Sequence, residues 1–487
     1  MDLSPSPILD AAASYSGEFA DLDTGRVVKA AEFHTGCKEL AQRLAAHGLR
    51  SGERVVVALD NGPHFVATFL AVLTQGGSPL LVHPKAPAPE LARTARRFGA
   101  TLILASDCPA ESLQSEASAV TRIEVADWID FSAARIDPHA PGFQSYGVEL
   151  PGVPLHPTSG TTGMPKVAVR PGHAAAEEAR HYIETMGVTA SDCIAAVAPM
   201  CHAYAFGMCV MVPLLSGARV LSLRSFQAGR LLQALVERRV TILPAVPAML
   251  DVLMFGAADR LQGAVRTVLT AGSPLAERTA RRFHDKSGVM VRPLYGTTET
   301  GGITVAPASD EQVAGACVGP PMRGVEAEVR PEANTTDAPP GVGRVHIRSS
   351  SMMCGYLGLD GIDSSMIKDG WFATGDLGRI DERGRIHLLG RETDVINLEG
   401  LKVIPSEVEE AITALAGVVD VKVYGGQRRN GSQFVKAAVV VENGLDEAAI
   451  RKHCESNLVY YKRPERIIPV ERLPRSPAGK ILRDQLP

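Results

Sequence analysis

Residues 158–166 of the chain read Thr158-Ser-Gly-Thr-Thr-Gly-Met-Pro-Lys166 and follow a Pro-rich, β-like approach. Gly160 and Gly163 can adopt positive φ angles, which lets backbone N–H groups converge on an anion. The hydroxyl side chains add donors, and Lys166 adds a positive charge. The segment predicts a polyphosphate-binding loop, with a plain surface turn as the alternative for such a loop taken alone. The expected phosphate-binding residues are Thr158, Ser159, Gly160, Thr161, Thr162, Gly163 and Lys166.

On both sides of this loop, short β-type runs alternate with helical patterns. Residues 53–60 and 101–106 read as strands, and residues 64–75 between them read as a helix. Strands that alternate with helices indicate parallel α/β layers. Beyond about residue 391 the pattern changes to helices and β-type runs of a different order, followed by a basic Pro-rich tail. The sequence thus predicts the fold class α/β, with a large N-terminal multi-layer α/β domain over 1–391 and a small α+β C-terminal domain over 392–487.

The composition is that of an ordinary globular protein. The chain has 487 residues, of which 45% are hydrophobic and 21% charged, and a formal net charge of −4. Such a length needs more than one domain, and the lack of surplus Lys and Arg argues against nucleic acid as a partner. No apolar run reaches the length of a membrane span, and the first residues lack the features of a secretory signal. The 8 cysteines are scattered without a CxxC pair, which favours reduced thiols and a cytoplasmic location.

Further motifs follow the loop along the chain. They are YGTTE at 295–299, TGD at 374–376, GR at 390–391 and PAGK at 477–480. Each motif is weak alone, but in this order they resemble the signature of the adenylate-forming superfamily. That superfamily contains acyl- and aryl-CoA synthetases, adenylation domains of peptide synthetases, and luciferases. Residues 59–84 are also similar to the family's N-terminal region, so the resemblance covers nearly the whole chain and is strongest to a stand-alone acyl- or aryl-CoA ligase.

The YGTTE motif supplies the expected contacts to adenine, phosphate and metal. By resemblance, adenine stacks on the ring of Tyr295, and Gly296 and Thr297 also bind the nucleotide. Thr298 is expected to donate a hydrogen bond to the α-phosphate and to take part in catalysis. Glu299 offers a carboxylate oxygen to Mg²⁺, which prefers carboxylates together with substrate phosphates.

Three residues further along complete the resemblance to an ATP site. Asp376 resembles the carboxylate that accepts the ribose hydroxyls, and Arg391 resembles the residue that contacts the ribose from the hinge side. Lys480 resembles the lysine that bridges the substrate carboxylate and the α-phosphate. Because an anionic carboxylate attacks an anionic phosphate, a positioned cation stabilises the transition state. Lys480 is therefore expected to be catalytic.

The segment PMCHAYAFG at 199–207 is expected to border the acid. By resemblance, His202 stands at the pocket mouth and acts near the carboxylate, although a lone His beside apolar residues is more often a core residue. Amino-acid activators usually carry a Phe-Asp pair where Cys201 and His202 stand, so a free α-amino acid is disfavoured. Aryl-acid activators often carry an Asn where Ala203 stands. The expected substrate-binding residues are Ala203, Phe206, Gly207, Ala271 and Gly272.

The segment after Arg391 resembles the loop that swings over the site for thioester formation when the mobile C-terminal domain rotates. Gly400 and Lys402 are expected to line the tunnel for the pantetheine thiol. The hinge is expected at Thr393 or Asp394. The family usually has Asp or Lys at the position of Thr393, which leaves the pivot open.

The predicted function is ATP-dependent activation of a carboxylic acid through an acyl-adenylate, followed by acyl transfer to the thiol of coenzyme A. The expected enzyme class is an AMP-forming acid–thiol ligase, with ATP and Mg²⁺ as cofactors and coenzyme A as co-substrate. The alternative is a stand-alone adenylating enzyme that loads a carrier-protein phosphopantetheine or another acceptor, because both thiols end the same pantetheine arm. A nucleotide-binding regulator without catalysis is disfavoured by the presence of Glu299, Asp376, Arg391 and Lys480.

Overall fold

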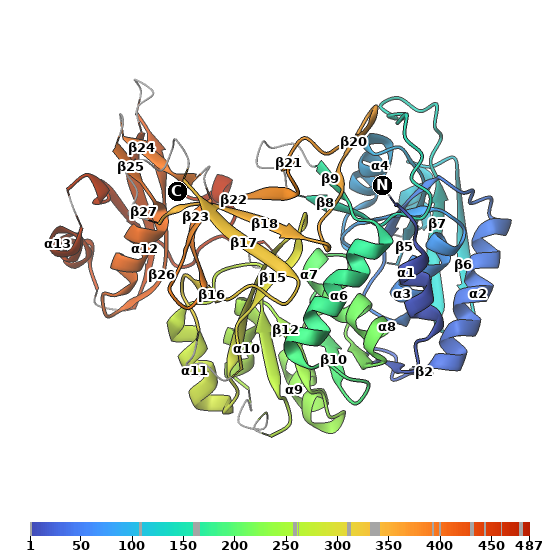
Figure 1. The fold of residues 1–487 in the computed structure, drawn as a ribbon, viewed down its shortest axis with the longest axis horizontal. Helices are drawn as coiled ribbons and strands as arrows, with labels where there is room; N and C mark the ends of the chain where they lie inside the picture. The colour runs from blue at the N-terminus through green and yellow to red at the C-terminus, as the bar shows by residue number, and fades with distance from the viewer. Residues whose placement is uncertain are drawn as a thin grey trace. The chain divides into compact units, whose positions relative to one another are not determined.

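The computed structural model describes residues 2–106, 110–158, 166–256, 261, 263–308, 313–331, 341–391, 394–398, 401–428, 433–442, 445–458, 460–476 and 481–487. The chain divides into two compact units (Figure 1). Unit 1 comprises Met1–Ala314, Pro321–Glu326 and Arg348–Phe372. Unit 2 comprises Gly315–Pro320, Ala327–Ile347 and Ala373–Pro487.

The first sheet of unit 1 has the strand order β15-β14-β13-β12-β10-β11-β1-β2. Neighbouring strands from β14 to β1 run parallel, and the outermost pairs, β14–β15 and β1–β2, are antiparallel. Parallel strands need both faces covered, which agrees with their almost continuous apolar sequences. The strands are β1 (Glu18–Asp21), β2 (Val27–Lys29), β10 (Cys193–Ala196), β11 (Arg219–Ser222), β12 (Ile242–Ala245), β13 (Thr267–Thr270), β14 (Val291–Thr297) and β15 (Gly301–Val305).

The second sheet of unit 1 has the strand order β20-β19-β9-β8-β4-β3-β5-β7-β6. Its central strands β5, β3, β4 and β8 pair in parallel, and the strands on both sides of them pair antiparallel. The strands are β3 (Arg54–Ala58), β4 (Ser78–Leu81), β5 (Ala100–Ala105), β6 (Ala119–Val125), β7 (Ile129–Arg135), β8 (Leu155–Thr158), β9 (Lys166–Val169), β19 (Gly355–Gly358) and β20 (Gly361–Asp363). The predicted α/β class, with parallel strands at the centre of each large sheet, is confirmed.

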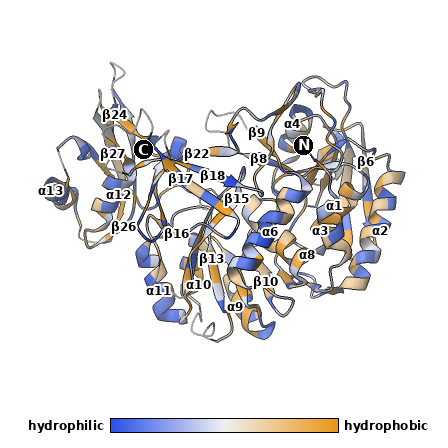
Figure 2. Cartoon of the chain, in the orientation of Figure 1, coloured by the Kyte–Doolittle hydropathy of each residue, from blue (hydrophilic) through white to orange (hydrophobic). Residues whose placement is uncertain are grey.

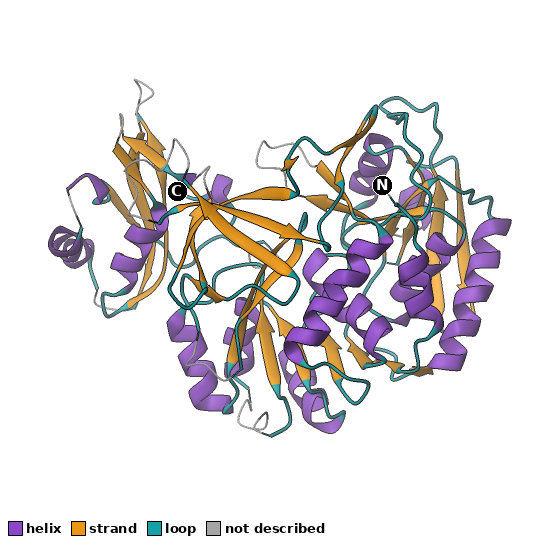
Figure 3. Cartoon of the chain, in the orientation of Figure 1, coloured by secondary structure: helices purple, strands orange, loops and turns teal. Residues whose placement is uncertain are grey.

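Helices cover these sheets (Figure 3). On α11 (Glu277–Ser287) the buried residues Ala280, Phe283 and Ser287 recur at helical spacing. Ala280 and Phe283 pack in the core of the first sheet, and the rest of the helix is mostly hydrophilic (Figure 2). The helix α3 (Pro63–Thr74) is buried on all sides, as its uniformly apolar sequence requires. The other helices are α1 (Ser6–Ala13), α2 (Ala30–Ala46), α4 (Ala88–Arg97), α5 (Ala110–Gln114), α6 (Gly172–Met186), α7 (Ala203–Phe206), the π-helical turn η1 (Gly207–Met211), α8 (Val212–Ser216), α9 (Ala228–Glu237) and α10 (Pro247–Met254).

Unit 2 contains most of a sheet with the order β16-β23-β22-β18-β17 and a smaller sheet β26-β27-β28. Helices α12 and α13 pack on the smaller sheet through Val408, Ile412 and Ile450. Their bounds are β16 (Cys317–Gly319), β17 (Val325–Arg330), β18 (Gly343–Ser349), β22 (Trp371–Ile380), β23 (Ile386–Arg391), β24 (Ile396–Leu398), β25 (Leu401–Val403), α12 (Pro405–Thr413), β26 (Val418–Gln427), β27 (Gln433–Val441), α13 (Glu447–Asn457) and β28 (Arg466–Pro469). The expected smaller C-terminal domain of mixed α and β structure is present.

The compact units and the predicted domains divide the chain at different places. Most of β22 and all of β23 belong to unit 2, because these strands pair antiparallel with each other. The predicted boundary at 391/392 concerns the part of the chain that moves, and it stays a prediction. None of the helices in the described ranges combines the length and the apolar character that a bilayer crossing requires.

Asn61 links the two sheets of unit 1. It lies in the turn between β3 and α3, is buried, and accepts a hydrogen bond from the N–H of Met200 at 2.8 Å. Its side-chain amide donates to carbonyl oxygens at the ends of β10 and β11, namely those of Ala196 (3.2 Å), Ala198 (3.0 Å) and Leu223 (3.2 Å). One side chain thereby fixes the segment that leads from β10 toward residue 202.

The change Asn61→Ala leaves these buried backbone groups without their partner. Unsatisfied buried groups of this kind cost about 1–3 kcal/mol, so we expect the free energy of unfolding to fall by about this amount in urea denaturation. The control is Asn457→Ala, because Asn457 is exposed on α13 and bonds mainly within its own helix. Equal stabilities of the two variants would contradict the assigned role of Asn61.

Candidate active site

The predicted site residues of unit 1 follow the carboxyl ends of strands in the first sheet. His202 comes after β10, Ala271 and Gly272 come directly after β13, and the YGTTE motif begins within β14. These strands are parallel members of one sheet, so their carboxyl ends lie at one edge. Ligands of open α/β sheets bind outside this edge. The fold therefore brings the expected acid-binding and nucleotide-binding segments to the same side of the sheet.

The YGTTE motif forms the turn between β14 and β15. The N–H of Thr297 donates to Oγ1 of Thr300 (3.3 Å), the N–H of Thr300 donates back to Oγ1 of Thr297 (3.2 Å), and the two hydroxyl oxygens are 3.0 Å apart. Tyr295 is buried before the turn, and its N–H donates to Oγ1 of Thr304 at 3.3 Å. At Gly296 a Cβ would come within 2.5 Å of the carbonyl oxygen of Gly301, which only glycine avoids. The turn is thus held by its own side chains and by the neighbouring strand.

Glu299 projects from this turn and is oriented by two residues from a distant segment. The Tyr356 hydroxyl donates to Oε1 of Glu299 at 2.8 Å, and the N–H of Met353 donates to the backbone oxygen of Glu299 at 2.7 Å. The carboxylate is half-buried, with Oε1 bonded to Tyr356. A hard, oriented carboxylate oxygen beside the hydroxyl-rich turn fits Mg²⁺, which takes the rest of its ligands from phosphates and water.

Thr158 and Lys166, the two ends of the expected phosphate loop, face each other across the antiparallel pair β8–β9. The Lys166 ammonium lies over the ring of Tyr356, 4.8 Å from its centre. Tyr356 therefore contacts the predicted phosphate lysine with its ring and the predicted metal ligand with its hydroxyl. One aromatic side chain thereby contacts a cation at its ring face and a carboxylate at its hydroxyl.

His202 and Phe206 lie at the two ends of α7, on the expected acid side. The exposed His202 ring packs against His83, with the ring centres 5.7 Å apart. Burial, reinforced by the nearby Lys85 cation, lowers the pKa of His83, which favours the neutral ring. Phe206 is fully buried and meets His156 edge-on at 5.0 Å. Burial lowers the pKa of His156 well below its usual value, so it is a neutral residue behind Phe206.

The remaining expected acid-binding residues have different surroundings. Gly207 begins the π-helical turn η1 and is buried, and π-helical turns are frequent at functional sites. Ala203 is half-buried, Ala271 is buried, and Gly272 is exposed with a φ of 89°. The roles of all these residues remain predictions.

Asp376 and Arg391 form an ion pair within unit 2. They are cross-strand neighbours on β22 and β23, and Nε of Arg391 lies 2.7 Å from Oδ1 of Asp376. The Asp376 side chain is 11% exposed and the Arg391 side chain 42%, so the carboxylate is held by a more accessible cation. The expected hinge residue Asp394 is paired with Arg483 near the C-terminus. The ribose-binding and hinge roles stay predictions.

Several predicted residues lie outside the described residues. They are Ser159, Gly160, Thr161, Thr162, Gly163, Thr393, Gly400 and Lys480. Lys402 lies in β25.

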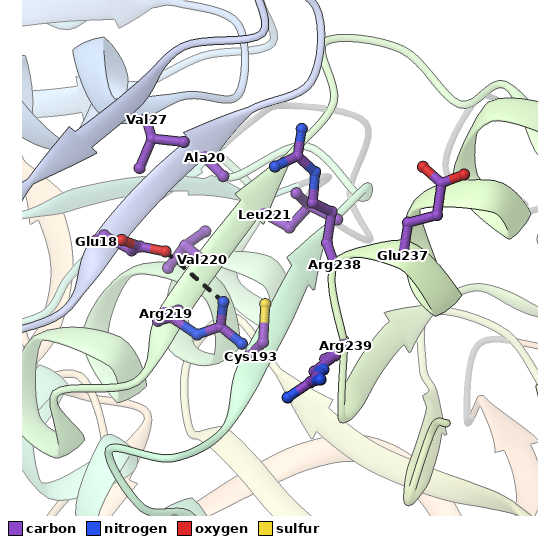
Figure 4. A pocket seen from close by; sticks show the side chains of 10 residues that line it. All are labelled: Glu18, Ala20, Val27, Cys193, Arg219, Val220, Leu221, Glu237, Arg238 and Arg239. Atoms are coloured by element: carbon purple, nitrogen blue, oxygen red, sulfur yellow. Dashed lines mark ion pairs between the residues drawn. The ribbon is translucent and has the colours of Figure 1, made fainter. Parts of the chain in front are cut away.

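A cavity of about 230 Å³ occurs at the opposite edge of the first sheet, at the amino-terminal starts of β1, β10 and β11 (Figure 4). Glu18 and Arg219 form an ion pair of 3.6 Å in it, and Cys193 also lines it. Those predicted site residues that the structure describes do not line this cavity. It is separate from the carboxyl edge that carries the predicted site.

The chain belongs to the AMP-binding enzyme family. The model of that family matches residues 10–357, and the model of the AMP-binding enzyme C-terminal domain matches residues 407–480. The predicted resemblance to the adenylate-forming superfamily, and within it to acyl- and aryl-CoA ligases, is confirmed.

Named relatives span nearly the whole chain. The chain is 26% identical to 4-coumarate-CoA ligase 1 from Narcissus pseudonarcissus, over 95% of this chain and 89% of the relative. It is 27% identical to the long-chain-fatty-acid–CoA ligase FadD13 from Mycobacterium tuberculosis, over 94% of this chain and 92% of the relative. The structure of ATP-bound MatB from Rhodopseudomonas palustris superposes with a TM-score of 0.82 at 26% identity, over 99% of this chain and 98% of that one.

Sequence reasoning missed Tyr356. It lies far along the chain, on β19, and reaches Glu299 and Lys166 because β19 pairs with β9 next to the phosphate loop. The pair Asn61 and Met200 was missed for a similar reason, since a turn of one sheet meets a strand end of the other. An isolated Tyr in the short run CGYLG carries no signal of such a contact.

The change Tyr356→Phe tests the orientation of Glu299. The ring remains under Lys166, but the hydroxyl that fixes the carboxylate is lost. We expect the half-saturating Mg²⁺ concentration for acid-dependent pyrophosphate exchange to rise severalfold, with the melting temperature close to that of the native protein. The comparison variant is Glu299→Gln, which should shift the same curve further. A native Mg²⁺ curve in Tyr356→Phe would contradict the assigned contact.

Proposed function

We propose that the protein activates a carboxylic acid with ATP, forming an acyl-adenylate and pyrophosphate, and then transfers the acyl group to the thiol of coenzyme A. The observation that carries the proposal is that Tyr356 of the second sheet contacts both Glu299 and Lys166. Glu299 lies at the edge of the first sheet that His202 and Ala271 also follow. The carboxylate for the metal thus shares an edge with the segment expected to bind the acid, and the cation for phosphate reaches that carboxylate's partner, Tyr356, from the second sheet. The activities named for the relatives agree with this function.

In the first half-reaction, a carboxylate oxygen of the acid attacks the α-phosphorus of ATP and pyrophosphate leaves. Mg²⁺, when bound, neutralises charge on the phosphates. Glu299 would hold Mg²⁺ through the carboxylate that Tyr356 orients, and Thr298 would donate to the α-phosphate. Lys166, with the glycine- and hydroxyl-rich loop before it, binds the leaving phosphates. Such preorganised charges are the usual source of rate enhancement in this kind of transfer.

The acid is bound by residues at both ends of α7 and after β13. His202 at its start is exposed and packed against a neutral His83, so its ring can approach the carboxylate of the acid. Phe206, Gly207 and Ala271 are buried and apolar, which suits the non-reacting part of an organic acid. The acid is consequently bound with its carboxylate toward the Glu299 turn.

The second half-reaction is proposed to follow a rotation of residues 392–487 about Thr393 and Asp394. Lys480, withdrawn by this rotation, is replaced by the loop of Gly400 and Lys402, which lines the path of the thiol. Asp376 and Arg391 retain the AMP ribose. The thiol sulfur attacks the acyl carbon, AMP leaves, and the thioester forms.

The acceptor thiol is proposed to be that of coenzyme A. A carrier-protein phosphopantetheine is the second candidate, because its arm ends in the same group. A cytoplasmic location remains part of the proposal and rests on the scattered cysteines of the sequence.

A pyrophosphate-release screen over aliphatic, aryl and polycyclic acids tests the first half-reaction, and thioester formation with coenzyme A or with carrier proteins tests the second. We expect release that depends on both acid and Mg²⁺, and a thioester with coenzyme A. Release without any acid dependence would contradict the proposed activity. Thioester formation with a carrier protein alone would replace coenzyme A as the acceptor.

The change Lys480→Ala should slow acyl-adenylate formation by roughly 10²–10³-fold, the usual scale for one lost transition-state contact. Thioester formation from supplied acyl-adenylate should proceed at close to the native rate, because Lys480 is withdrawn in that step. The two rates are measured separately by pyrophosphate exchange and by thiol consumption. An equal loss in both half-reactions would rule out the assigned role.

A further inference from the structure

Two oppositely charged side chains are completely buried in unit 1. Arg170 directly follows β9, Glu178 lies on α6, and both are 0% exposed. Nη2 of Arg170 donates to Oε2 of Glu178 at 2.8 Å. Arg170 and Glu178 were not among the residues expected to act in the reaction, yet they lie on the elements that follow the phosphate loop.

The Glu178 carboxylate is in close contact with backbone on both sides. Its second oxygen, Oε1, accepts a hydrogen bond from the N–H of Gly302 at 2.9 Å. A Cβ on Gly301 would lie 2.7 Å from Cδ of Glu178, and a Cβ on Gly207 would lie 2.9 Å from Oε1. The carboxylate therefore fills the space between the start of β15 and the start of η1, and these glycines are what allow the approach.

The Arg170 guanidinium reaches the other side of the same turn. Nη2 also donates to the backbone oxygen of Ser351 at 3.1 Å, and the Ser351 hydroxyl donates to the backbone oxygen of Thr300 at 2.9 Å. Thr300 closes the turn that carries Glu299. Glu178 thus holds the turn at Gly302, and Arg170 holds it at Thr300 through Ser351.

Stability alone does not account for this pair. Among the described residues, Nε and Nη1 of Arg170 have no hydrogen-bond partner, although they are buried. Buried ion pairs seldom stabilise a fold more than nonpolar residues of similar volume, because desolvation offsets their attraction. The charged pair supplies hydrogen bonds of fixed direction, which a nonpolar pair cannot supply.

We propose that Arg170 and Glu178 are positioning residues. They fix the position of the Glu299 turn relative to the start of η1, and thereby the position of the metal and α-phosphate relative to the acid. The proposal rests on the function given above. Glu178 spans the gap between the two parts of the site, since it contacts Gly302 beyond the turn and Gly207 beside Phe206. Adenylation needs the carboxylate oxygen and the phosphorus in line, and a misplacement of about 1 Å can cost about 10²-fold in rate.

The double variant Arg170→Met with Glu178→Leu tests the proposal, because it removes both charges and leaves neither buried alone. We expect the variant to be folded at the assay temperature with a moderately lowered melting temperature, because the N–H of Gly302 and the backbone oxygen of Ser351 each lose a partner. The single-turnover rate of adenylation, corrected by active-site titration, should fall about 10²-fold. The dissociation constants of Mg-ATP alone and of the acid alone, measured by calorimetry, should change much less. This split between rate and binding is not produced by partial unfolding.

The control is Arg266→Met with Asp192→Leu, an ion pair in which Asp192 is buried and the Arg266 side chain is 37% exposed. Nε of Arg266 is 2.8 Å from Oδ1 of Asp192, and this pair joins the starts of β10 and β13, at the sheet edge opposite the site. We expect its corrected adenylation rate to be native. Glu178→Gln provides the second test, because it keeps an acceptor for Gly302 and loses the charge. Its rate should lie between those of the native protein and the double variant.

A native single-turnover rate in the double variant would overturn the proposal. So would an equal rate loss in the Arg266–Asp192 control, or failure of both Glu178 variants to fold, because each would make the pair a general support of the fold. If the proposed function itself is wrong, the native protein will show no acid-dependent pyrophosphate exchange.

Discussion

A carboxylate removed from water has to regain the lost hydration free energy from cations and donors around it. Glu178 regains it from the Arg170 guanidinium and from the N–H of Gly302. Because these partners lie after β9 and at the start of β15, the requirement fixes the position of α6 against both strands. The turn that carries Glu299 and the first residues of η1 are placed as a consequence. The chemistry proposed for unit 1 depends on this one buried charge being neutralised in one geometry.

Directional hydrogen bonds also fix the positions of the neighbouring segments. Asn61 fixes the approach to His202 through the carbonyl groups at the ends of β10 and β11. Tyr356 fixes the Glu299 carboxylate and lies under Lys166. Apolar packing stabilises the sheets, whereas these few polar contacts position the reactive groups. That division is expected where a site needs groups held to within a fraction of an ångström.

Much of the fold could be predicted from the sequence, because strand and helix periodicities are local. The alternation around 53–106 became the parallel centre of the second sheet, and the motifs at 295–299 and 199–207 follow strands of the first sheet at its carboxyl edge. Tyr356, Arg170 and Glu178 could not be found in this way. Their contacts join strands and a helix that are distant in sequence, and each residue alone looks like an ordinary strand or helix position. An Arg directly after the apolar run VAV at 167–169 was the one local signal of a buried charge.

The proposed function depends most directly on a bond between a carboxylate oxygen of the acid and the α-phosphorus of ATP. The most direct measurement uses an acid labelled with ¹⁸O in its carboxylate, with coenzyme A present, and mass spectrometry of the products. We expect the AMP formed to carry an ¹⁸O atom from the acid and the pyrophosphate to carry none. Label in phosphate or pyrophosphate, or formation of ADP in place of AMP, would contradict it.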